Sequence, residues 1–188
     1  MTTYTLAGGC FWCLDAVYRK LRGVTGSISG YTGGHSERPS YHQVINGDTG
    51  HAEAVQVTFD ELVIPHETIL DIFFLIHDPT SLNRQGADVG TQYRSAMFYM
   101  DERQKQDFEA ARARARRHWD KPIVTDIRPF ETFYEAEEYQ QDYFARNPAN
   151  PYCPIVISPK VAKAKKAYTK WFTEQSKSID EILKEKEL

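Results

Sequence analysis

Residues 3–21 read TYTLAGGCFWCLDAVYRKL, and this stretch decides how the fold begins. A β-prone run, Thr3 to Leu6, stops at two glycines, and from Phe11 onward apolar residues recur at the spacing of one helix face. Cys10 is therefore predicted at a turn from a strand into a helix. Unpaired N–H groups and the helix dipole favour a thiolate at such a position, so we expect Cys10 to be the reactive thiol.

The rest of the chain alternates predicted strands and helices. Strands are expected at 24–31, 54–59, 95–100 and 123–127, and helices at 65–76, 101–118, 134–144 and 161–172. Residues 77–93 form a long segment without periodicity, which is typical of a functional loop. The order of elements predicts an α/β (α+β) fold class, a sandwich in which helices cover a small mixed sheet.

Length and charge restrict the class of protein. The 188 residues, 41% of them hydrophobic, predict one domain, 1–188, with a core at 1–152 and a C-terminal segment at 153–188. A net charge of -3 with dispersed basic residues indicates no nucleic-acid partner. The chain shows no signal peptide and no membrane span, so we expect a soluble, cytoplasmic protein.

The three cysteines are too few for a disulfide scaffold, so reactive or metal-binding thiols are the better interpretations. Cys10-x-x-Cys13 is compatible with half of a zinc site, a general disulfide-redox module or two buried inert cysteines. A zinc site needs further ligands, for which the candidates are His35, His42 and His51. The position behind two glycines favours redox or nucleophilic chemistry.

Two polar segments accompany the cysteines. Residues 50–53 read GHAE and follow Tyr41 by about ten positions. Taken alone, Glu53 is an ordinary charge at a strand edge; in an apolar pocket its pKa would rise and it would serve as a proton donor. Residues 77–95, HDPTSLNRQGADVGTQYRS, form either a well-knit surface loop or a binding loop.

The segments GCFW (9–12), GHAE (50–53), HDPT (77–80), NRQG (83–86) and GTQYRS (90–95) together resemble the A-type methionine sulfoxide reductases, over residues 4–152. The resemblance implies a two-layer sandwich with a ferredoxin-like core. It further implies thiol-dependent reduction of methionine S-sulfoxide, free or in proteins, through a sulfenic acid and an intramolecular disulfide. The external dithiol would be thioredoxin, and no metal or other cofactor is implied.

The same resemblance implies a role for each matching residue. Four residues would be catalytic: Cys10 as nucleophile, Glu53 as the acid that protonates the sulfoxide oxygen, and Tyr41 and Tyr93 as hydroxyl donors to it. Three residues would bind substrate, with the methyl group held by two aromatic rings: Phe11, Trp12 and Asp88. These roles match the chemistry, because the sulfur becomes electrophilic only as its oxygen is neutralised.

A second thiol must then condense with the Cys10 sulfenic acid. Cys153 lies at the C-terminal YC position where many family members carry the resolving cysteine, although the Gly-rich tail common there is absent. Cys13 stands where many relatives have glycine. We expect Cys153 to attack first, with Cys13 relaying the disulfide or acting directly. Two further departures, Ser81 for Gln and Gln140 for His, are expected to affect packing more than chemistry.

Overall fold

The computed structural model describes residues 1–173, and the expected C-terminal segment therefore falls partly outside it, at residues 174–188. Its strands are β1 (Thr2–Gly8), β2 (Val24–Thr32), β3 (Ala52–Phe59), β4 (Arg84–Gln85), β5 (Asp88–Val89), β6 (Ser95–Tyr99), β7 (Asp126–Pro129) and β8 (Phe133–Glu135). Its helices are α1 (Phe11–Tyr18), α2 (Tyr41–Ile45), α3 (His66–Ile76), α4 (Glu102–Ala115), α5 (Tyr143–Arg146) and α6 (Ser158–Ala167). Within the described residues, no helix has both the length and the apolar character needed to cross a bilayer.

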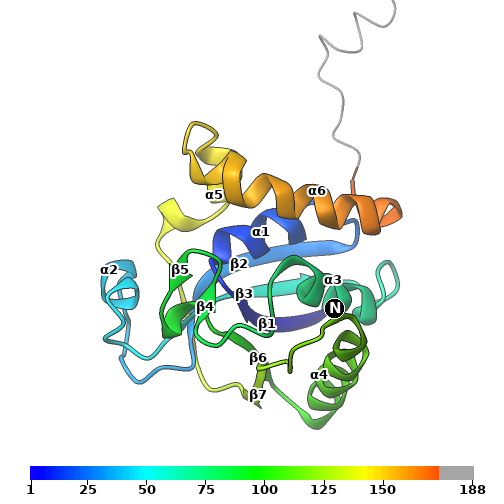
Figure 1. Ribbon diagram of the computed structural model, residues 1–188, viewed down its shortest axis with the longest axis horizontal. Coiled ribbons are helices and arrows are strands. Elements are labelled where there is room, and N and C mark those ends of the chain that lie inside the picture. Colours follow the sequence, from blue (N-terminus) through cyan, green and yellow to red (C-terminus); the bar gives the residue numbers. More distant parts are fainter. Residues whose placement is uncertain (174–188) are drawn as a thin grey trace, which may run out of the picture.

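Six strands form one mixed sheet in the order β7-β6-β1-β3-β2-β8, and β4 pairs with β5 in a separate hairpin (Figure 1). β1 runs antiparallel to β3 and β6, β2 antiparallel to β3 and β8, and β7 parallel to β6. The unit β1-α1-β2-β3-α3-β6 thus has the strand order 4-1-3-2 of a ferredoxin-like split β-α-β arrangement. The predicted α/β class with a mixed sheet and a ferredoxin-like core is confirmed.

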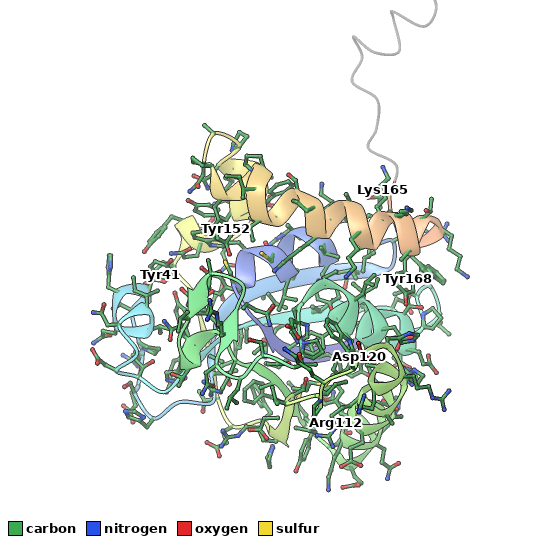
Figure 2. The ribbon with its side chains drawn as sticks, viewed as in Figure 1. Tyr41, Arg112, Asp120, Tyr152, Lys165 and Tyr168 are labelled. Carbon is green, nitrogen blue, oxygen red and sulfur yellow. The ribbon has the colours of Figure 1, made fainter. Side chains whose placement is uncertain are left out.

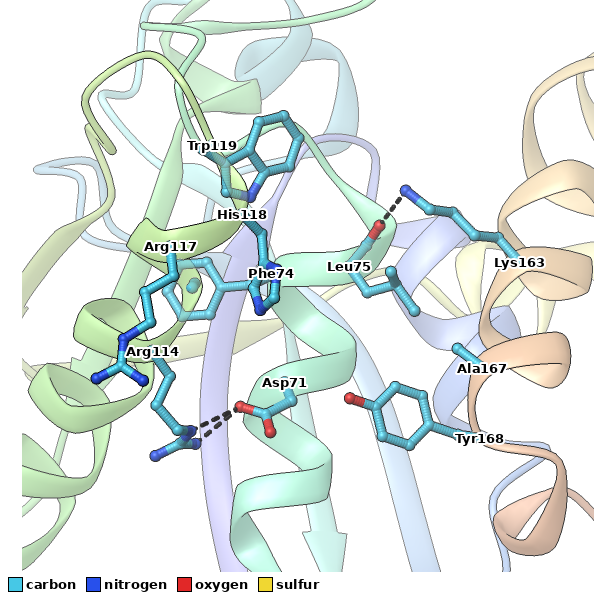
Figure 3. Close-up of a pocket in the computed structure, with 11 residues that line it drawn as sticks. Asp71, Phe74, Leu75, Arg114, Arg117, His118, Trp119, Lys163, Ala167 and Tyr168 are labelled. Carbon is cyan, nitrogen blue, oxygen red and sulfur yellow. Dashed lines mark hydrogen bonds and ion pairs between the residues drawn. The ribbon is translucent and has the colours of Figure 1, made fainter.

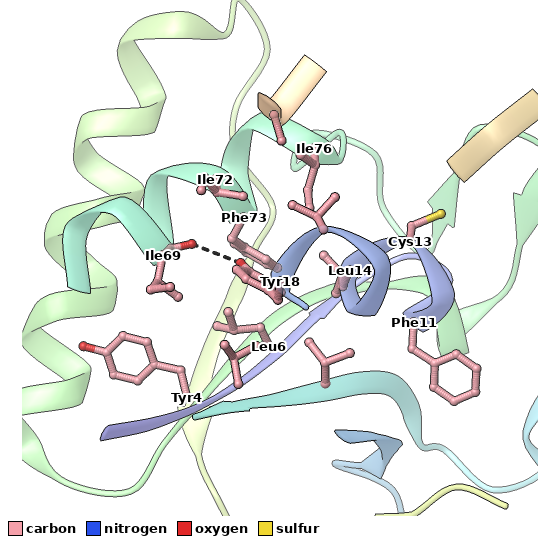
Figure 4. Packing of buried hydrophobic residues seen from close by; sticks show 14 of the residues in the cluster. Tyr4, Leu6, Phe11, Cys13, Leu14, Tyr18, Ile69, Ile72, Phe73 and Ile76 are labelled. Carbon is pink, nitrogen blue, oxygen red and sulfur yellow. Dashed lines mark hydrogen bonds between the residues drawn. The ribbon is translucent and has the colours of Figure 1, made fainter. Parts of the chain in front are cut away.

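The main core lies between the sheet and helices α1 and α3 (Figure 4). Alternation in β1 directs Tyr4 and Leu6 toward the helices, where both are fully buried. Tyr18 of α1 is also fully buried, and its hydroxyl donates to the Ile69 carbonyl of α3 at 3.0 Å. Each such apolar side chain contributes about 1.5–3 kcal/mol on burial. Helix α6 lies along the outer side of α1 (Figure 1).

The strand registers bring several chain segments to one end of the sheet. Leu6 of β1 pairs with Val55 of β3, and Gly8 and Glu53 each lie two residues further toward the same end of the sheet. Gly8 pairs with Ser95, and Glu53 pairs with Tyr31. The turn after β1, the loop between β2 and β3, and the loop before β6 therefore meet at this end.

The predicted helix at 134–144 is wrong. Tyr134 instead lies in β8, opposite Tyr31 of β2, and only Tyr143–Arg146 is α-helical. The Gln141 side chain bonds both the N–H and the carbonyl of Ser29, and Asp142 adopts a positive φ of 50°. These contacts with a strand about a hundred residues away outweigh the local helix pattern.

Other boundaries shift by a few residues. The predicted strand at 123–127 is displaced to Asp126–Pro129, because the Thr125 hydroxyl bonds Ser95 and the Val124 N–H bonds Pro79 before the strand begins. The last predicted helix begins earlier, at Ser158, and ends at Ala167. The short helix α2 was not predicted, although Ser40 and Gln43 form a capping box at its start.

Gly9 connects β1 to α1 with a positive φ of 86°, and a Cβ there would lie 2.4 Å from Gln85 Cγ. Gly47 has a similar φ of 83° but nothing within 4 Å of such a Cβ. We expect Gly47→Ala to cost only the left-handed strain of about 1–2 kcal/mol. Gly9→Ala should lower the free energy of unfolding in urea by more than this, because Gln85 must move. It should also slow the reductase activity that the sequence leads us to expect. Equal losses for both variants would contradict this contact.

Candidate active site

Cys10 occupies the N-cap of α1, directly after the Gly9 turn, as the sequence predicted. Its carbonyl accepts the Cys13 N–H at 3.1 Å, which closes the first turn and sets the two side chains on the same side of the helix. The Cys10 side chain is buried, with 7% of the residue exposed. The sulfur is therefore largely shielded from bulk solvent.

Glu53 lies inside β3 and not at its exposed edge. Alternation places it in the same row as Val55 and Val57, which face the helices, so the carboxyl points into the core and is 1% exposed. Its Oε2 accepts the backbone N–H of Phe11 at 3.0 Å. That N–H is one of the unpaired donors at the start of α1, so the carboxyl is fixed one residue from Cys10.

Burial raises the pKa of Glu53 to about 8. The Phe11 hydrogen bond opposes this shift by stabilising the carboxylate, whereas the negative charges of Asp88 and Cys13 reinforce it. At neutral pH the group is mainly a carboxylic acid. Such an acid can donate a proton to a leaving oxygen.

Tyr41 and Tyr93 approach Glu53 and Cys10 from two separate loops. Tyr41 begins α2, and its ring centroid lies 6.4 Å from that of Phe11 and 6.5 Å from that of Trp12. Burial raises the pKa of both tyrosine hydroxyls, and the charges of Glu53 and Cys10 add to the shift. Both hydroxyls therefore stay protonated and are available as donors.

The two thiols at the start of α1 interact, with opposite effects. Burial raises the pKa of Cys10 well above its usual value, helped by its hydrogen bond with Cys13 and the charge of Glu53. The hydrogen bond with Cys10 lowers the pKa of Cys13 to about 7, and the Lys160 ammonium assists. The helix N-terminus predicted a lowered pKa for Cys10, but the desolvation of its thiolate outweighs that effect.

Trp12 is held at its edge and its face. Its Nε1–H donates to Gln140 Oε1 at 2.8 Å, and its ring stacks on Tyr143 with centroids 3.6 Å apart and planes 6° from parallel. Gln140, expected to affect only packing detail, therefore contacts a predicted substrate-binding residue. Nothing near Gln140 in the sequence signals this contact, since its partner is 128 positions away.

Asp88 projects from the β4-β5 hairpin and accepts a hydrogen bond from the Tyr152 hydroxyl at 2.7 Å. The Tyr152 ring packs edge-on against Trp12, with centroids 5.8 Å apart. Figure 2 shows Tyr41 and Tyr152 on the same side of the molecule. Tyr152 was not among the predicted site residues, although it precedes Cys153.

Cys153 is buried, and its Sγ donates to the Asn147 carbonyl at 3.3 Å. Burial raises the pKa of its thiol, and the negative charge of Cys13 raises it further. All three thiols are free.

The loop before β6 is tied down by buried polar groups. His77 contacts the Phe73 carbonyl through Nδ1 at 2.6 Å and the Ser95 hydroxyl through Nε2 at 2.7 Å. Burial lowers the pKa of His77 to about 4, so the ring is neutral. Gln85 accepts the Asp78 N–H and donates to the Asp78 carbonyl. These bonds hold the loop that carries Asp88 and Tyr93.

The zinc interpretation finds little support. Within residues 1–173, no three His, Cys, Asp or Glu side chains gather closely enough to hold a metal ion. His51 uses both ring nitrogens, with Nδ1 accepting from the Gly34 N–H at 3.0 Å and Nε2 contacting the Ser36 carbonyl at 2.7 Å. A large cavity of about 720 Å³ lies elsewhere, between α3, α6 and the end of α4 (Figure 3). An Asp71–Arg114 ion pair crosses its wall, and it includes none of the predicted site residues.

Comparison with known proteins identifies the family of this chain. The sequence model of the family described as peptide methionine sulfoxide reductase matches residues 2–172. The chain belongs to the peptide methionine sulfoxide reductase family. It is 58% identical to the peptide methionine sulfoxide reductase MsrA of Paenarthrobacter aurescens, over 92% of this chain and 99% of that protein.

Solved structures agree with this assignment. The crystal structure of reduced Mxr1 from Saccharomyces cerevisiae is 38% identical, with a TM-score of 0.77 over 81% of this chain and 89% of that one. Mxr1 in complex with Trx2 is also similar, at 27% identity and a TM-score of 0.54 over 76% and 84% of the two chains. The predicted enzyme class, a thiol-dependent reductase for methionine sulfoxide, is confirmed.

The raised pKa of Glu53 should make the stability of the reductase depend on pH. The folded carboxyl keeps its proton up to pH about 8, whereas the unfolded one loses it near 4.5. The wild type should therefore lose stability as pH rises from about 4.5 to 8. Glu53→Gln removes this dependence and should be the more stable protein at pH 8.5. Urea unfolding at pH 5, 7 and 8.5 measures the free energy of unfolding of both proteins. The same pH dependence in the wild type and in Glu53→Gln would contradict the raised pKa of Glu53.

Proposed function

We propose that this reductase acts on methionine S-sulfoxide with Cys10 as its nucleophile and Glu53 as its acid. The observation that carries the proposal is the 3.0 Å hydrogen bond from the Phe11 N–H to Glu53 Oε2. It ties a buried carboxylic acid to the residue that follows the thiol. A sulfoxide sulfur is attacked by a cysteine sulfur only while its oxygen is being protonated, and this pair supplies the attacking sulfur and the acid.

The first step transfers the oxygen of the sulfoxide to Cys10. The Cys10 sulfur bonds the substrate sulfur while Glu53 protonates the oxygen, and Tyr41 and Tyr93 donate hydrogen bonds to it. The proton that Cys10 loses as its S–H bond breaks returns Glu53 to its acid form. Rearrangement breaks the sulfur–oxygen bond, releases methionine and leaves a sulfenic acid on Cys10. Sulfoxide sulfur is reduced by two electrons, and the Cys10 sulfur is oxidised by two.

The aromatic rings beside the sulfur are suited to the uncharged end of the substrate. Phe11 and Trp12 hold the methyl group, since neither ring offers a charge to an apolar methyl. Asp88 positions the polar part of the substrate from the hairpin on the other side of the pocket. The substrate is oxidised methionine, free or within a protein.

We propose that Cys13 condenses with the Cys10 sulfenic acid and that Cys153 then takes over the disulfide. Its contact with Cys10 and its pKa of about 7 favour Cys13 as the first attacking thiol. Cys153, which the sequence suggested as first, has its thiol turned to the Asn147 carbonyl. Condensation releases water, and attack of Cys153 on Cys13 frees Cys10.

A dithiol completes the cycle by reducing the last disulfide. We propose thioredoxin for this role, supported by the complex of the similar Mxr1 with Trx2. No metal or other cofactor is needed, because thiols supply both electrons. The need for three reduced cysteines supports a cytoplasmic location. Residues 1–188 act as one catalytic domain, in which the segment from Cys153 onward serves the core 1–152.

Turnover of the two separated epimers of a blocked methionine sulfoxide, with dithiothreitol as reductant, tests the nucleophile. The wild type should reduce the S epimer alone. Cys10→Ser should lower its rate by at least about a thousandfold, because the hydroxyl is a far weaker nucleophile at neutral pH. Residual turnover within tenfold of the wild type would exclude Cys10 from the chemical step.

The order of the other two cysteines is tested by one equivalent of sulfoxide without reductant. Cys153→Ser should release one methionine and hold a Cys10–Cys13 disulfide, while Cys13→Ser should accumulate sulfenic acid. Peptide mapping after alkylation distinguishes these products. The proposed order would be wrong if Cys13→Ser formed a Cys10–Cys153 disulfide at the wild-type rate.

A further inference from the structure

Tyr143 connects the substrate side of the site to the segment that carries Cys153. Its ring covers the face of Trp12 at a centroid distance of 3.6 Å. Its hydroxyl accepts a hydrogen bond from Asn150 Nδ2 at 2.8 Å. One side chain therefore contacts both a predicted substrate-binding residue and the turn before Cys153.

Asn150 passes this connection on to the resolving segment. Its carbonyl accepts the Cys153 N–H at 3.0 Å, and its Oδ1 accepts the Tyr152 N–H at 2.9 Å. The Asn147 side chain also donates to the Tyr143 carbonyl, at 3.0 Å. Residues 147–153 are thus fastened to α5 by side-chain bonds that converge on Tyr143.

Within this turn the Cys153 thiol is bonded to the backbone. Its hydrogen is donated to the Asn147 carbonyl at 3.3 Å, and the residue is 2% exposed. A disulfide requires the two Cβ atoms to approach to about 3.5–4.5 Å with a defined torsion. Cys153 must therefore leave the Asn147 carbonyl before it can attack.

We propose that Tyr143 is a positioning residue whose hydroxyl, through Asn150, holds Cys153 in its resting place until the disulfide is passed on. This inference rests on the proposed use of Cys153 in the cycle. In the step it controls, the Cys153 sulfur bonds Cys13, the Cys10–Cys13 bond breaks, and Cys10 leaves as a thiolate that takes the Cys153 proton. This exchange involves no net oxidation or reduction.

The stack on Trp12 gives the hold a connection to the substrate pocket. Trp12 has its indole N–H fixed by Gln140 and its face fixed by Tyr143, so a shift of the indole moves the Tyr143 ring.

The test measures alkylation of Cys153 by iodoacetamide in the reduced resting enzyme, followed by peptide mapping. Tyr143→Phe keeps the ring but removes the hydroxyl, and we expect alkylation about fivefold faster, the effect of losing one net hydrogen bond. Tyr139→Phe is the matched control, since Tyr139 lies in the same segment and is 56% exposed. Its alkylation rate should equal that of the wild type.

Asn150→Ala removes the other partner and should accelerate alkylation by a similar factor. The double variant should react no faster than Asn150→Ala alone, because Asn150→Ala already removes the bond to the Tyr143 hydroxyl as well as the one to the Tyr152 N–H. Gln140→Leu frees the indole edge, so it should raise the KM for sulfoxide and, because the Tyr143 ring follows the indole, also accelerate Cys153 alkylation. Thermal unfolding by circular dichroism identifies any variant whose reactivity comes from lost folding. Unchanged alkylation in Tyr143→Phe, or additive effects in the double variant, would overturn the proposal.

The catalytic consequence is measured separately. After one equivalent of sulfoxide, the disulfide that includes Cys153 should form about fivefold faster in Tyr143→Phe than in the wild type. A rate unchanged or slower would overturn the hold. Cys153→Ser could turn over normally while Tyr143→Phe still accelerated the alkylation of Cys153. That result would support the restraint of Cys153 by Tyr143 and contradict the resolving role of Cys153.

Discussion

The hydrogen bond from the Phe11 N–H to Glu53 Oε2 is the contact on which the rest of the site depends. A helix start leaves N–H groups without partners, and a carboxyl buried on a strand needs a donor. Each group satisfies the other, so helix α1 and strand β3 cannot shift independently. The same bond sets the distance between the nucleophile Cys10 and the acid Glu53. One contact therefore both stabilises the fold and positions the catalytic groups.

The order and register of the strands bring the start of α1 and Glu53 to the same end of the sheet. The antiparallel pairing of β1 with β3 brings the end of β1 to the same end of the sheet as Glu53, and pairing of β1 with β6 brings the His77 to Arg94 loop there too. The end of β2 delivers the loop with Tyr41. Residues from three loops and one strand therefore surround Cys10, although they are spread over more than eighty positions.

Much of this could be predicted from patterns within a dozen residues. The Gly-Gly-Cys turn, the helix after it and the alternation of β3 are local signals, and that alternation already assigns Glu53 to the row of Val55 and Val57. The structure of residues 133–146 could not be predicted in this way. Strand β8 forms only by pairing with β2, and the Gln140 side chain is bonded to Trp12. Local propensity contains no information about partners more than a hundred residues away.

The balance of charge explains how a buried thiol and a buried carboxyl work together. In water a glutamic acid loses its proton near pH 4.5 and a cysteine near 9, so neutral pH would give a carboxylate beside a thiol. Here the pKa of Glu53 is about 8 and that of Cys13 about 7, which reverses the order. Two negative charges close together are unfavourable at this buried place. A single negative charge is shared between the sulfurs of Cys10 and Cys13. Burial is the main cause of the raised pKa of Cys10; a neutral Glu53 adds no negative charge to it and keeps the proton that the sulfoxide oxygen requires.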